Sequence, residues 1–427
     1  MSEVYKYDRS IARATQAKIT IPGGVNSNVR LISDPCPLTF TRGQGSKIWD
    51  VDNNQYLDFA MGMGPHILGH SPKSVISAVR EALDEGQLFA GQNIYETQLA
   101  ELFVSINPWI EQIRIGLSGT EMNLLAIRIA RARTEKQKII KFFGHYHGWL
   151  DPLFINPTAV DSHEESILTS GQSKASAKDV LLTTWNDIGS LEAIADREND
   201  IAAIIMEPLM CNTGCIEPAP EYLQQVQSFC RSRGIVLIID EVITGFRLGL
   251  QGAQGYFGIK GDISVYAKAI GSGFPIAILG SSADLLREVG TGKINHSGTY
   301  NAGVSSTVAA LATLTELKLS DPFEKIQLIG LKLMNELSKL KTKDGVHLNA
   351  EGTGHLFQLR FGPTERPDNL IGFKESSDGE TLKKFLSVWQ KLGVRTTSRG
   401  MCFLSAAHTL TDIDFAAEKA AEAISEI

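Results

Sequence analysis

The feature that most constrains the fold is an alternation, in the middle of the chain, between short apolar runs and longer amphipathic stretches. Helical patterns start near residue 121 and cover 219–233, and runs rich in Val, Ile and Leu occupy residues 113–117, 138–143, 201–206 and 234–240. Near-continuous apolar strands between helices are typical of a mostly parallel sheet that is covered on both faces. The middle of the chain is therefore predicted to form an α/β layer domain.

The two ends of the chain carry a different pattern. Residues 46–59 alternate apolar and polar side chains around an Asp-Asn-Asn turn signal, which is typical of a β-hairpin. After Gly303 a helical pattern runs to about residue 340 and is followed by shorter strand and helix patterns. These patterns predict a smaller α+β domain built from both chain ends. The expected limits are 1–60 for its N-terminal segment, 61–315 for the large domain and 316–427 for its C-terminal part.

Composition and charge narrow the range of partners. The chain has 427 residues, 43% of them hydrophobic, which is enough to bury two or more compact lobes. Its net charge of -7 is spread without a basic stripe, which argues against binding to nucleic acid. The N-terminal residues lack the apolar core of a signal peptide, and the longest fully apolar runs, such as 235–239, are too short to span a bilayer. We expect a cytoplasmic protein that acts on small molecules.

The cysteines indicate neither disulfides nor a metal site. There are five of them, an odd number without the spacing of a disulfide framework. Cys211 and Cys215 are the only close pair, and no second pair of Cys or His follows at a spacing that would complete a set of metal ligands. The sequence therefore predicts free thiols and no bound metal.

A first candidate for chemistry is the stretch Ser118, Gly119, Thr120 and Glu121, between a predicted strand and a predicted helix. Ser118 with Glu121 matches a capping box, which is a common way to start a helix. The same stretch would present backbone N–H groups and two hydroxyls at the positive end of a helix dipole, as a phosphate cradle does. Taken alone, the stretch favours the capping box.

A second candidate is Gly-His-Tyr-His-Gly at 144–148, which follows the predicted strand at 138–143. Open α/β sheets bind ligands at the carboxyl ends of their strands. His145 and His147 could be metal ligands, but no third ligand lies in range. Stacking of the Tyr146 ring on a flat ligand is the favoured interpretation.

Two charged residues follow other predicted strands. Asp240 should lie at the buried C-terminal end of a central strand, where a carboxylate is costly unless a cation meets it. It could cap a helix, form a structural ion pair, or hold a protonated heteroaromatic nitrogen. Lys268 ends another strand-like run directly before a glycine-rich turn, which alone would suggest a surface lysine.

These four elements are more informative together. A phosphate cradle, a ring for stacking, a carboxylate for a pyridinium nitrogen and an amine for an imine each meet a different need of one cofactor, pyridoxal 5'-phosphate. The residues therefore predict a pyridoxal phosphate site.

The motifs of this site belong to a resemblance that covers nearly the whole chain. It includes Pro-Gly-Gly-Val-Asn-Ser-Asn-Val-Arg at 22–30, Ser-Gly-Thr-Glu at 118–121, Gly-His-Tyr-His-Gly at 144–148, Asp-Glu-Val-Ile-Thr-Gly-Phe-Arg at 240–247 and Ser-Gly-Thr-Tyr-Asn at 297–301. On these motifs the sequence resembles the class III aminotransferases of fold-type I, and within them the subgroup of glutamate-1-semialdehyde 2,1-aminomutase. The resemblance implies a large domain around a mostly parallel sheet, a smaller α+β domain, and pyridoxal 5'-phosphate as cofactor.

The resemblance also assigns roles to the residues that match these motifs. Lys268 would bind the cofactor's aldehyde as a Schiff base, and Asp240 would keep its ring nitrogen protonated. Tyr146 would cover one face of the ring and Val242 the other. The phosphate would be held by the cradle residues Ser118, Gly119 and Thr120.

Further roles are implied around the ring and the substrate. Glu207 and Asn212, in Glu-Pro-Leu-Met-Cys-Asn-Thr-Gly at 207–214, match family positions near the cofactor ring. Thr299 would reach the phosphate bound by the neighbouring subunit, which implies a homodimer. Arg30 matches an arginine that grips the substrate carboxylate, a role that suits a bidentate guanidinium.

The C-terminal segment departs from the aminomutase pattern. The mutase has an acidic residue before its Ser-Leu-Ala-His-Thr-like motif, whereas residues 396–409 of this chain contain no carboxylate. Arg399 instead resembles an arginine of the β-amino-acid transaminase branch that binds a substrate carboxylate. We therefore expect an aminotransferase that moves an amino group between an amino acid, β-amino acids included, or an amine and a 2-oxo acid. The alternative is the aminomutase, which gives 5-aminolevulinate by intramolecular transfer.

Two other classes of protein fit the sequence less well. A dinucleotide-dependent oxidoreductase needs Gly-x-Gly-x-x-Gly after the first strand of a βαβ unit, and the nearest match, at 62–69, has the wrong spacing and context. A non-catalytic binding protein would have no reason to keep both Asp240 and Lys268. We expect an enzyme with small-molecule substrates and with neither a nucleic-acid nor a membrane partner.

Overall fold

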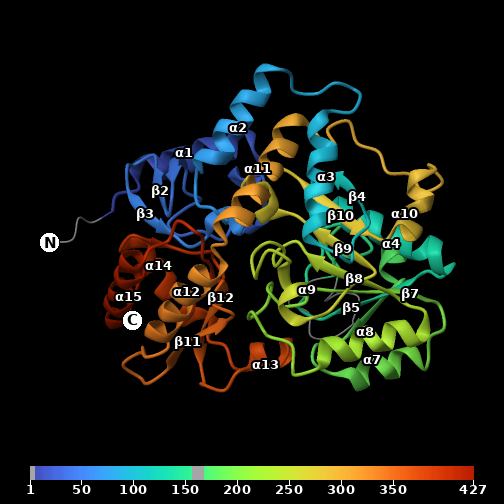
Figure 1. The fold of residues 1–427 in the computed structure, drawn as a ribbon. Coiled ribbons are helices and arrows are strands. Elements are labelled where there is room, and N and C mark those ends of the chain that lie inside the picture. Colours follow the sequence, from blue (N-terminus) through green and yellow to red (C-terminus); the bar gives the residue numbers. More distant parts are fainter. Residues whose placement is uncertain (1–4, 156–167) are drawn as a thin grey trace. The chain divides into compact units, whose positions relative to one another are not determined.

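The computed structural model describes residues 5–155 and 168–427 of the chain (Figure 1). They form two compact units. The central unit comprises Lys73–Phe323 and Pro367–Glu375, and the end unit comprises the residues up to Pro72, Glu324–Arg366 and Ser376–Ile427. The end unit is drawn from both ends of the chain, as expected for the smaller domain. The two compact units do not test the exact domain limits expected at residues 60 and 315, so those limits stay a prediction.

The central unit is built on a seven-stranded sheet of order β4-β10-β9-β8-β7-β5-β6. Neighbours from β6 to β9 pair in parallel, and β10 pairs antiparallel with both β4 and β9. The predicted α/β fold with a mostly parallel sheet is confirmed. The strands are β4 Gln112–Gly116, β5 Lys138–Phe142, β6 Val180–Thr183, β7 Ile201–Met206, β8 Val236–Glu241, β9 Ile263–Tyr266 and β10 Ala277–Ser281.

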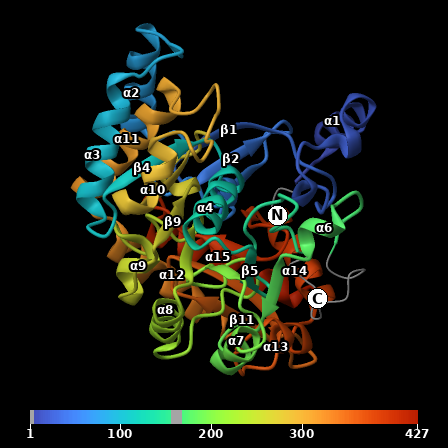
Figure 2. The ribbon, with the colours of Figure 1, turned by 90° about the vertical axis from the view of Figure 1, so that its right-hand side faces the viewer.

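Helices cover both faces of this sheet (Figures 1 and 2). α4 (Gly119–Thr134) packs against β7, β8, β9 and β10, and its buried residues share one core with Ile205. α7 (Ile188–Ala195) and α8 (Tyr222–Arg233) share a second core with Ile204. Adjacent strand residues face different cores because side chains alternate along a strand.

The long helical pattern expected from Gly303 to about residue 340 was wrong in one respect, because two helices occupy it. α11 (Val304–Ser320) ends where Asp321 takes a left-handed φ of 38°, and Pro322 cannot continue a helix. α12 (Phe323–Leu337) then begins. The remaining helices of the central unit are α2 Lys73–Asp84, α3 Ile94–Ile106, α6 Lys174–Ala177, α9 Gly252–Phe257, α10 Ala283–Gly290 and α13 Leu370–Glu375.

The end unit contains two small sheets, of order β1-β2-β3-β13 and β11-β12-β14. β2 and β3 pair antiparallel, which confirms the hairpin predicted within residues 46–59. The strands are β1 Phe40–Gln44, β2 Lys47–Asp50, β3 Gln55–Asp58, β11 His347–Gly352, β12 Leu356–Gly362, β13 Val394–Arg395 and β14 Met401–Phe403. Besides α12, its helices are α1 Asp8–Thr20, α14 Gly379–Lys391 and α15 Leu410–Ser425, with short 3-10 turns η1 Pro22–Gly24, η2 Asn28–Arg30 and η3 Met61–Met63.

No helix within residues 5–155 and 168–427 is both long enough and apolar enough to cross a membrane.

Candidate active site

Four strands of the central sheet lead into residues that the sequence singles out. Tyr146 follows β5, Glu207 follows β7, Asp240 lies near the end of β8, and Lys268 follows β9. Because these strands run parallel, their carboxyl ends bring the four residues to one edge of the sheet. This edge is the candidate active site.

Asp240 lies on the middle strand of the sheet and is 4% exposed. Its Oδ2 accepts hydrogen bonds from Asn123 Nδ2 of α4 and from Nδ1 of His147, each at 2.8 Å. Its Oδ1 accepts one from the backbone N–H of Val242 at 3.0 Å. A buried carboxylate needs such donors, since burying it unpaired would be costly. The three bonds fix the direction of the carboxylate and leave Oδ1 able to accept one more donor.

The two histidines of the 144–148 loop use Nδ1 in opposite ways, since His145 accepts a hydrogen bond there and His147 donates one. Burial lowers the pKa of His145 well below its usual value, and it also lowers the pKa of His147 against the opposing effect of Asp240. His145 Nδ1 accepts a hydrogen bond from the backbone N–H of Glu207 at 3.0 Å, so its proton lies on Nε2. His147 donates through Nδ1, since a carboxylate only accepts. Among the described residues, no group of three or more His, Cys, Asp or Glu could hold a metal ion.

Glu207 organises the side of the site next to Tyr146. Its Oε1 accepts hydrogen bonds from the backbone N–H of Tyr146 at 2.7 Å and from Asn212 Nδ2 at 3.0 Å. Its Oε2 accepts one from the backbone N–H of Cys211 at 3.1 Å. Burial raises the pKa of Glu207 to about 7, and the nearby charge of Asp240 acts in the same direction. Glu207 therefore links the β5 loop to the loop that carries Asn212.

Lys268 lies in a strained turn directly after β9. It begins the 3-10 turn η4 (Lys268–Gly271) with a φ of 50°, a left-handed value that is uncommon for a residue with a side chain. Ser272 repeats this conformation at 45°. Strain of this kind clusters at functional sites. Lys268 is partly buried, so the fold does not place it as the surface lysine that its glycine-rich neighbourhood alone would suggest.

The N-terminus of α4 has the capping box expected from the sequence. Ser118 Oγ accepts a hydrogen bond from the backbone N–H of Glu121 at 3.3 Å, and Glu121 Oε2 accepts those of Leu117 and Ser118 at 3.0 Å. Among the described residues, the backbone N–H groups of Gly119 and Thr120 have no hydrogen-bond partner. Capping box and anion cradle are therefore compatible, because the box uses neither of the two donors that a phosphate would need.

Two glycines keep this cradle open. A Cβ on Gly119 would lie 2.6 Å from Cγ2 of Val242, and a Cβ on Gly148 would lie 2.4 Å from Oγ1 of Thr120. Gly148 also has a φ of 98°, which favours glycine. These close approaches bring α4, the β5 loop and the end of β8 side by side.

Tyr146 presents its ring at the same edge of the sheet. The residue is 36% exposed, and its ring meets that of Phe154 at right angles, with centroids 6.4 Å apart. A ring in this position keeps surface available for stacking.

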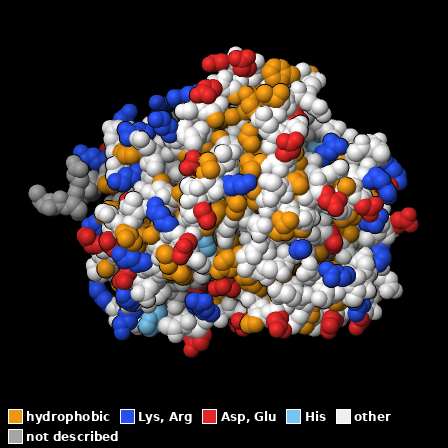
Figure 3. All heavy atoms as spheres, in the orientation of Figure 1, with side chains coloured by type: hydrophobic (Ala, Val, Ile, Leu, Met, Phe, Trp, Pro, Cys, Tyr) orange, Lys and Arg blue, Asp and Glu red, His pale blue; other side chains and the backbone are white. Residues whose placement is uncertain are grey.

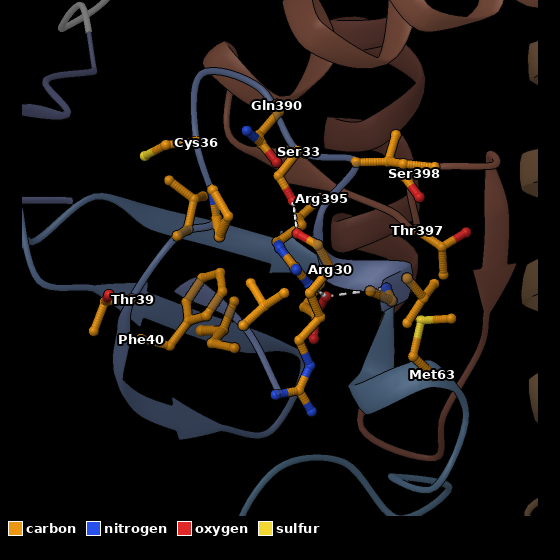
Figure 4. A pocket seen from close by; sticks show the side chains of 18 of the residues that line it. Arg30, Ser33, Cys36, Thr39, Phe40, Met63, Gln390, Arg395, Thr397 and Ser398 are labelled. Atoms are coloured by element: carbon orange, nitrogen blue, oxygen red, sulfur yellow. Dashed lines mark hydrogen bonds and ion pairs between the residues drawn. The ribbon is translucent and has the colours of Figure 1, made fainter. Parts of the chain in front are cut away.

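The end unit contains a pocket of about 980 Å³ that Arg30 and Met63 line (Figure 4). Basic side chains outnumber acidic ones in its lining, which includes Arg13, Arg30, Arg42, Lys383 and Arg395 against Asp34 and Asp58. Asp58 is buried and already pairs with His70 at 2.8 Å and with Arg395 at 3.5 Å. The pocket therefore suits a carboxylate or another small anion.

Arg399 belongs to the end unit but is not among the described residues that line this pocket. It is exposed, in the turn closed by a hydrogen bond from the N–H of Gly400 to the carbonyl of Thr397 at 2.9 Å. Its own carbonyl accepts a hydrogen bond from Nε2 of Gln358 at 3.1 Å. Of the two arginines expected to bind carboxylates, only Arg30 lines the pocket, and Arg395 lines it in addition.

Thr299 lies on an exposed part of the central unit. The segment around it is tied to the start of α3, because Asn93 Nδ2 donates to the carbonyl of Ala302 at 2.8 Å. Large apolar side chains are exposed in these two segments, among them Leu88, Phe89, Ile94 and Tyr300. Figure 3 shows hydrophobic side chains gathered over the surface that α2, α3 and α11 form.

Two residues near the site were not singled out from the sequence. Asn123 is a polar residue on the buried face of α4, between apolar neighbours, and that position could have marked it. Lys141 stands in the otherwise apolar strand β5, is 1% exposed, and donates to the carbonyl of Leu153 at 3.1 Å. Burial lowers the pKa of Lys141 to about 8, against the charges of Glu207 and Asp240.

The fold and the sheet edge together define a class of protein, the fold-type I pyridoxal-phosphate transferases. More particularly, the chain belongs to the family described as aminotransferase class-III, whose sequence model matches residues 30–427. Members of this family are enzymes, and pyridoxal phosphate is their cofactor.

Relatives with curated names and solved structures point to different activities within the family. The chain is 34% identical over 418 residues to a glutamate-1-semialdehyde 2,1-aminomutase of Fusobacterium nucleatum, a match that covers 96% of this chain and 95% of that protein. Among solved structures, an omega-transaminase from Sphaerobacter thermophilus is 28% identical with a TM-score of 0.89, covering 97% of each chain. A beta-phenylalanine aminotransferase from Variovorax paradoxus is 29% identical with a TM-score of 0.87, covering 97% of this chain and 93% of that one.

Proposed function

We propose that the chain is an aminotransferase that uses pyridoxal 5'-phosphate to move an amino group between an amino acid, β-amino acids included, or an amine and a 2-oxo acid. The observation that carries this choice is the turn at Arg399, where residues 396–409 provide an exposed cation and no carboxylate. Arg30, in a basic pocket of the same unit, would hold a carboxylate as well. Cations at both places suit an enzyme that exchanges one acid for another.

The residues at the sheet edge fit the cofactor. The N–H groups of Gly119 and Thr120 would hold its phosphate at the positive end of α4. Oδ1 of Asp240 can accept one more donor, such as a protonated ring nitrogen. Tyr146 and Val242 would cover the two faces of the ring, with Glu207 and Asn212 beside it, and Ser118 would support the phosphate site as the cap of α4.

When bound, pyridoxal phosphate supplies an aldehyde that reacts with amines and an electron-poor ring that takes up the electron pair left when a proton is removed. Lys268 would hold the cofactor through its Nζ. When it is not holding the cofactor, the Nζ of Lys268 would act as a base, taking the proton from the substrate carbon that bears the nitrogen and returning it at another atom. Asp240 would favour this step, because its fixed negative charge keeps the ring nitrogen protonated. Arg30 would orient the substrate through its carboxylate.

A second candidate is the aminomutase reaction, in which the amino group moves within one molecule. The relatives named glutamate-1-semialdehyde 2,1-aminomutase favour it, since they match nearly the whole chain. The same groups of the sheet edge would serve both reactions. The difference would lie in whether the intermediate product leaves before the second half of the reaction.

For assembly we propose a homodimer, in which Thr299 of the partner subunit reaches the cofactor phosphate. The exposed apolar side chains near Thr299 support an interface on that surface. Light scattering coupled to size-exclusion chromatography should give a mass twice that of the single chain. A cytoplasmic location, expected from the sequence, stays a prediction.

The experiment that separates the two activities uses purified protein loaded with pyridoxal phosphate. Amino acids and β-amino acids are offered one at a time, and the absorption of the cofactor reports the first half-reaction. In a parallel assay, glutamate-1-semialdehyde is supplied with no amino acceptor. Conversion of an amino donor that needs an added 2-oxo acid supports the proposal. Efficient formation of 5-aminolevulinate in the parallel assay would overturn it in favour of the aminomutase.

A further inference from the structure

We infer that His147 is a positioning residue of the proposed site. Through its Nδ1–H it holds the carboxylate of Asp240 in the direction that serves the cofactor's ring nitrogen, and it does so as a neutral ring. The inference rests on the proposed function, in which Asp240 meets that nitrogen. It gives a role to the histidine that follows Tyr146, which the mechanism above does not use.

The first argument is how the oxygens of Asp240 are shared. Oδ2 receives both side-chain donors, Nδ1 of His147 and Nδ2 of Asn123, each at 2.8 Å. Oδ1 receives only the backbone N–H of Val242, at 3.0 Å. A carboxylate oxygen accepts about two hydrogen bonds, so Oδ2 is saturated and Oδ1 is not. Because His147 and Asn123 occupy Oδ2, that oxygen bonds to the protein, while Oδ1 stays available to a ligand.

The second argument concerns the protonation of His147. Its Nδ1 must carry a proton because it faces an oxygen of a carboxylate. Its Nε2 is buried and has no hydrogen-bond partner among the described residues, so a second proton there would be a buried and unsatisfied donor. The ring is therefore expected to be the neutral form with its proton on Nδ1.

The charges around His147 agree with a neutral ring. Asp240 from β8 favours a second proton, whereas burial and Lys141 from β5 oppose it, and the pKa of His147 is lowered on balance. The ring of His145 in the same loop lies 6.0 Å away, centroid to centroid, and is itself neutral. Asn123 from α4 contributes a dipole, donating both to Asp240 and to the carbonyl of His147, the latter at 3.1 Å.

A neutral donor has a specific advantage at this position. It stabilises the negative charge of Asp240 by one charge-assisted hydrogen bond without cancelling that charge. A cationic ring would compete with the ring nitrogen for the same carboxylate. His147 therefore fixes the direction of the Asp240 carboxylate and leaves its negative charge uncancelled.

The test compares two substitutions of similar shape. In His147→Asn the amide nitrogen can take the place of Nδ1 and keep the donor, whereas His147→Leu removes it at nearly the same volume. We expect His147→Leu to lower kcat about tenfold to a hundredfold with little change in KM, and His147→Asn to stay within about threefold of the parent. The pH at which the bound cofactor changes its absorption should shift in His147→Leu and hardly in His147→Asn. Equal effects of the two substitutions would mean that His147 only fills space, and would overturn the inference.

A second variant and a cofactor-free measurement keep the inference testable. If His147→Leu does not fold, His147→Gln replaces it, since the longer side chain carries its amide nearer to Nε2 and misses Asp240. Independently, nitrogen NMR of labelled histidines in the cofactor-free protein should show His147 neutral with its proton on Nδ1 at pH 7. A cationic ring or a proton on Nε2 would refute the inference even if the protein bound no pyridoxal phosphate. Absence of cofactor binding by the parent protein would refute the proposed function instead.

Discussion

Charged residues are held in opposite ways at the sheet edge of the central unit and at the two arginines of the end unit, Arg30 and Arg399. At the sheet edge, Asp240 and Glu207 are buried, and each carboxylate accepts three hydrogen bonds from fixed donors. In the end unit, Arg30 and Arg399 are exposed and lie in short turns. Buried and satisfied groups are preorganised for a single geometry, which suits the chemistry that a whole family shares. Exposed arginines on turns can change with little cost to the fold, which suits the selection of substrates.

The largest effect is expected when the amine of Lys268 is removed from the sheet edge. In Lys268→Ala we expect turnover to be abolished while the fold persists, because the change removes both the group that holds the cofactor and the proton carrier. Lys260→Ala, which truncates an exposed lysine of the same unit, should behave like the parent and serves as the control. Steady-state assays with circular dichroism check both variants. Activity close to that of the parent in Lys268→Ala would refute the assignment of the site.

A somewhat smaller effect is expected at Asp240. Asp240→Asn should still bind the cofactor but lose about a hundredfold or more in kcat, because a neutral amide no longer stabilises a protonated ring nitrogen. Single-turnover absorption of the cofactor measures this step directly. A loss of only a few-fold would show that Asp240 is structural, and the sheet edge would then be less preorganised than its hydrogen bonds suggest.

In the end unit, a substitution of Arg399 should change the KM for one substrate only. Arg399→Ala should raise the KM for a dicarboxylic partner such as 2-oxoglutarate about tenfold to a hundredfold and hardly affect an uncharged amine donor. Arg399→Lys should recover part of the affinity, because it keeps the charge but not the bidentate geometry. If both substrates suffer equally, Arg399 acts on the fold rather than on the carboxylate.

The smallest effect should come from the cap of α4. Ser118→Ala removes the acceptor for the N–H of Glu121 and should lower the free energy of unfolding by about 1 kcal/mol. Ser118→Asp keeps a capping side chain and should restore most of that stability. Urea titration of the cofactor-free protein measures both. A change below a few tenths of a kcal/mol would mean that the cap contributes little to holding the cradle in place.

The sequence predicted the sheet edge well because its signals are local. The apolar runs predicted the strands, and a charged or aromatic residue near the end of a run predicted what lies at the carboxyl end of the strand, as for Tyr146 and Asp240. The capping box at Ser118 was predicted for the same reason. The local pattern of Asn123, a polar residue between apolar neighbours, could have marked it as unusual, but it does not show that a strand far along the chain carries its partner.

The pocket of the end unit was harder to predict because its walls come from distant segments. Arg30 was found by its motif, but Arg395 drew no attention, since its place beside Asp58 depends on the pairing of β13 with β3. The helical pattern expected from Gly303 to about residue 340 is divided into two helices by a short-range signal that the prediction did not use, the Asp-Pro step at 321–322.

The position of Asp240 on the middle strand also has a consequence for how the protein folds. Its two side-chain partners are separated from it by 117 and 93 residues along the chain. The carboxylate cannot be satisfied until the crossovers that lead from α4 and from β5 to β8 have closed, and such non-local closures are slow. We therefore expect the central unit to assemble its strands before the catalytic edge is complete, so that partly folded chains would carry a buried and unmatched charge at the middle of the sheet. For a chain of this kind, the yield of refolded protein would depend on closing those crossovers faster than exposed strands find one another in aggregates.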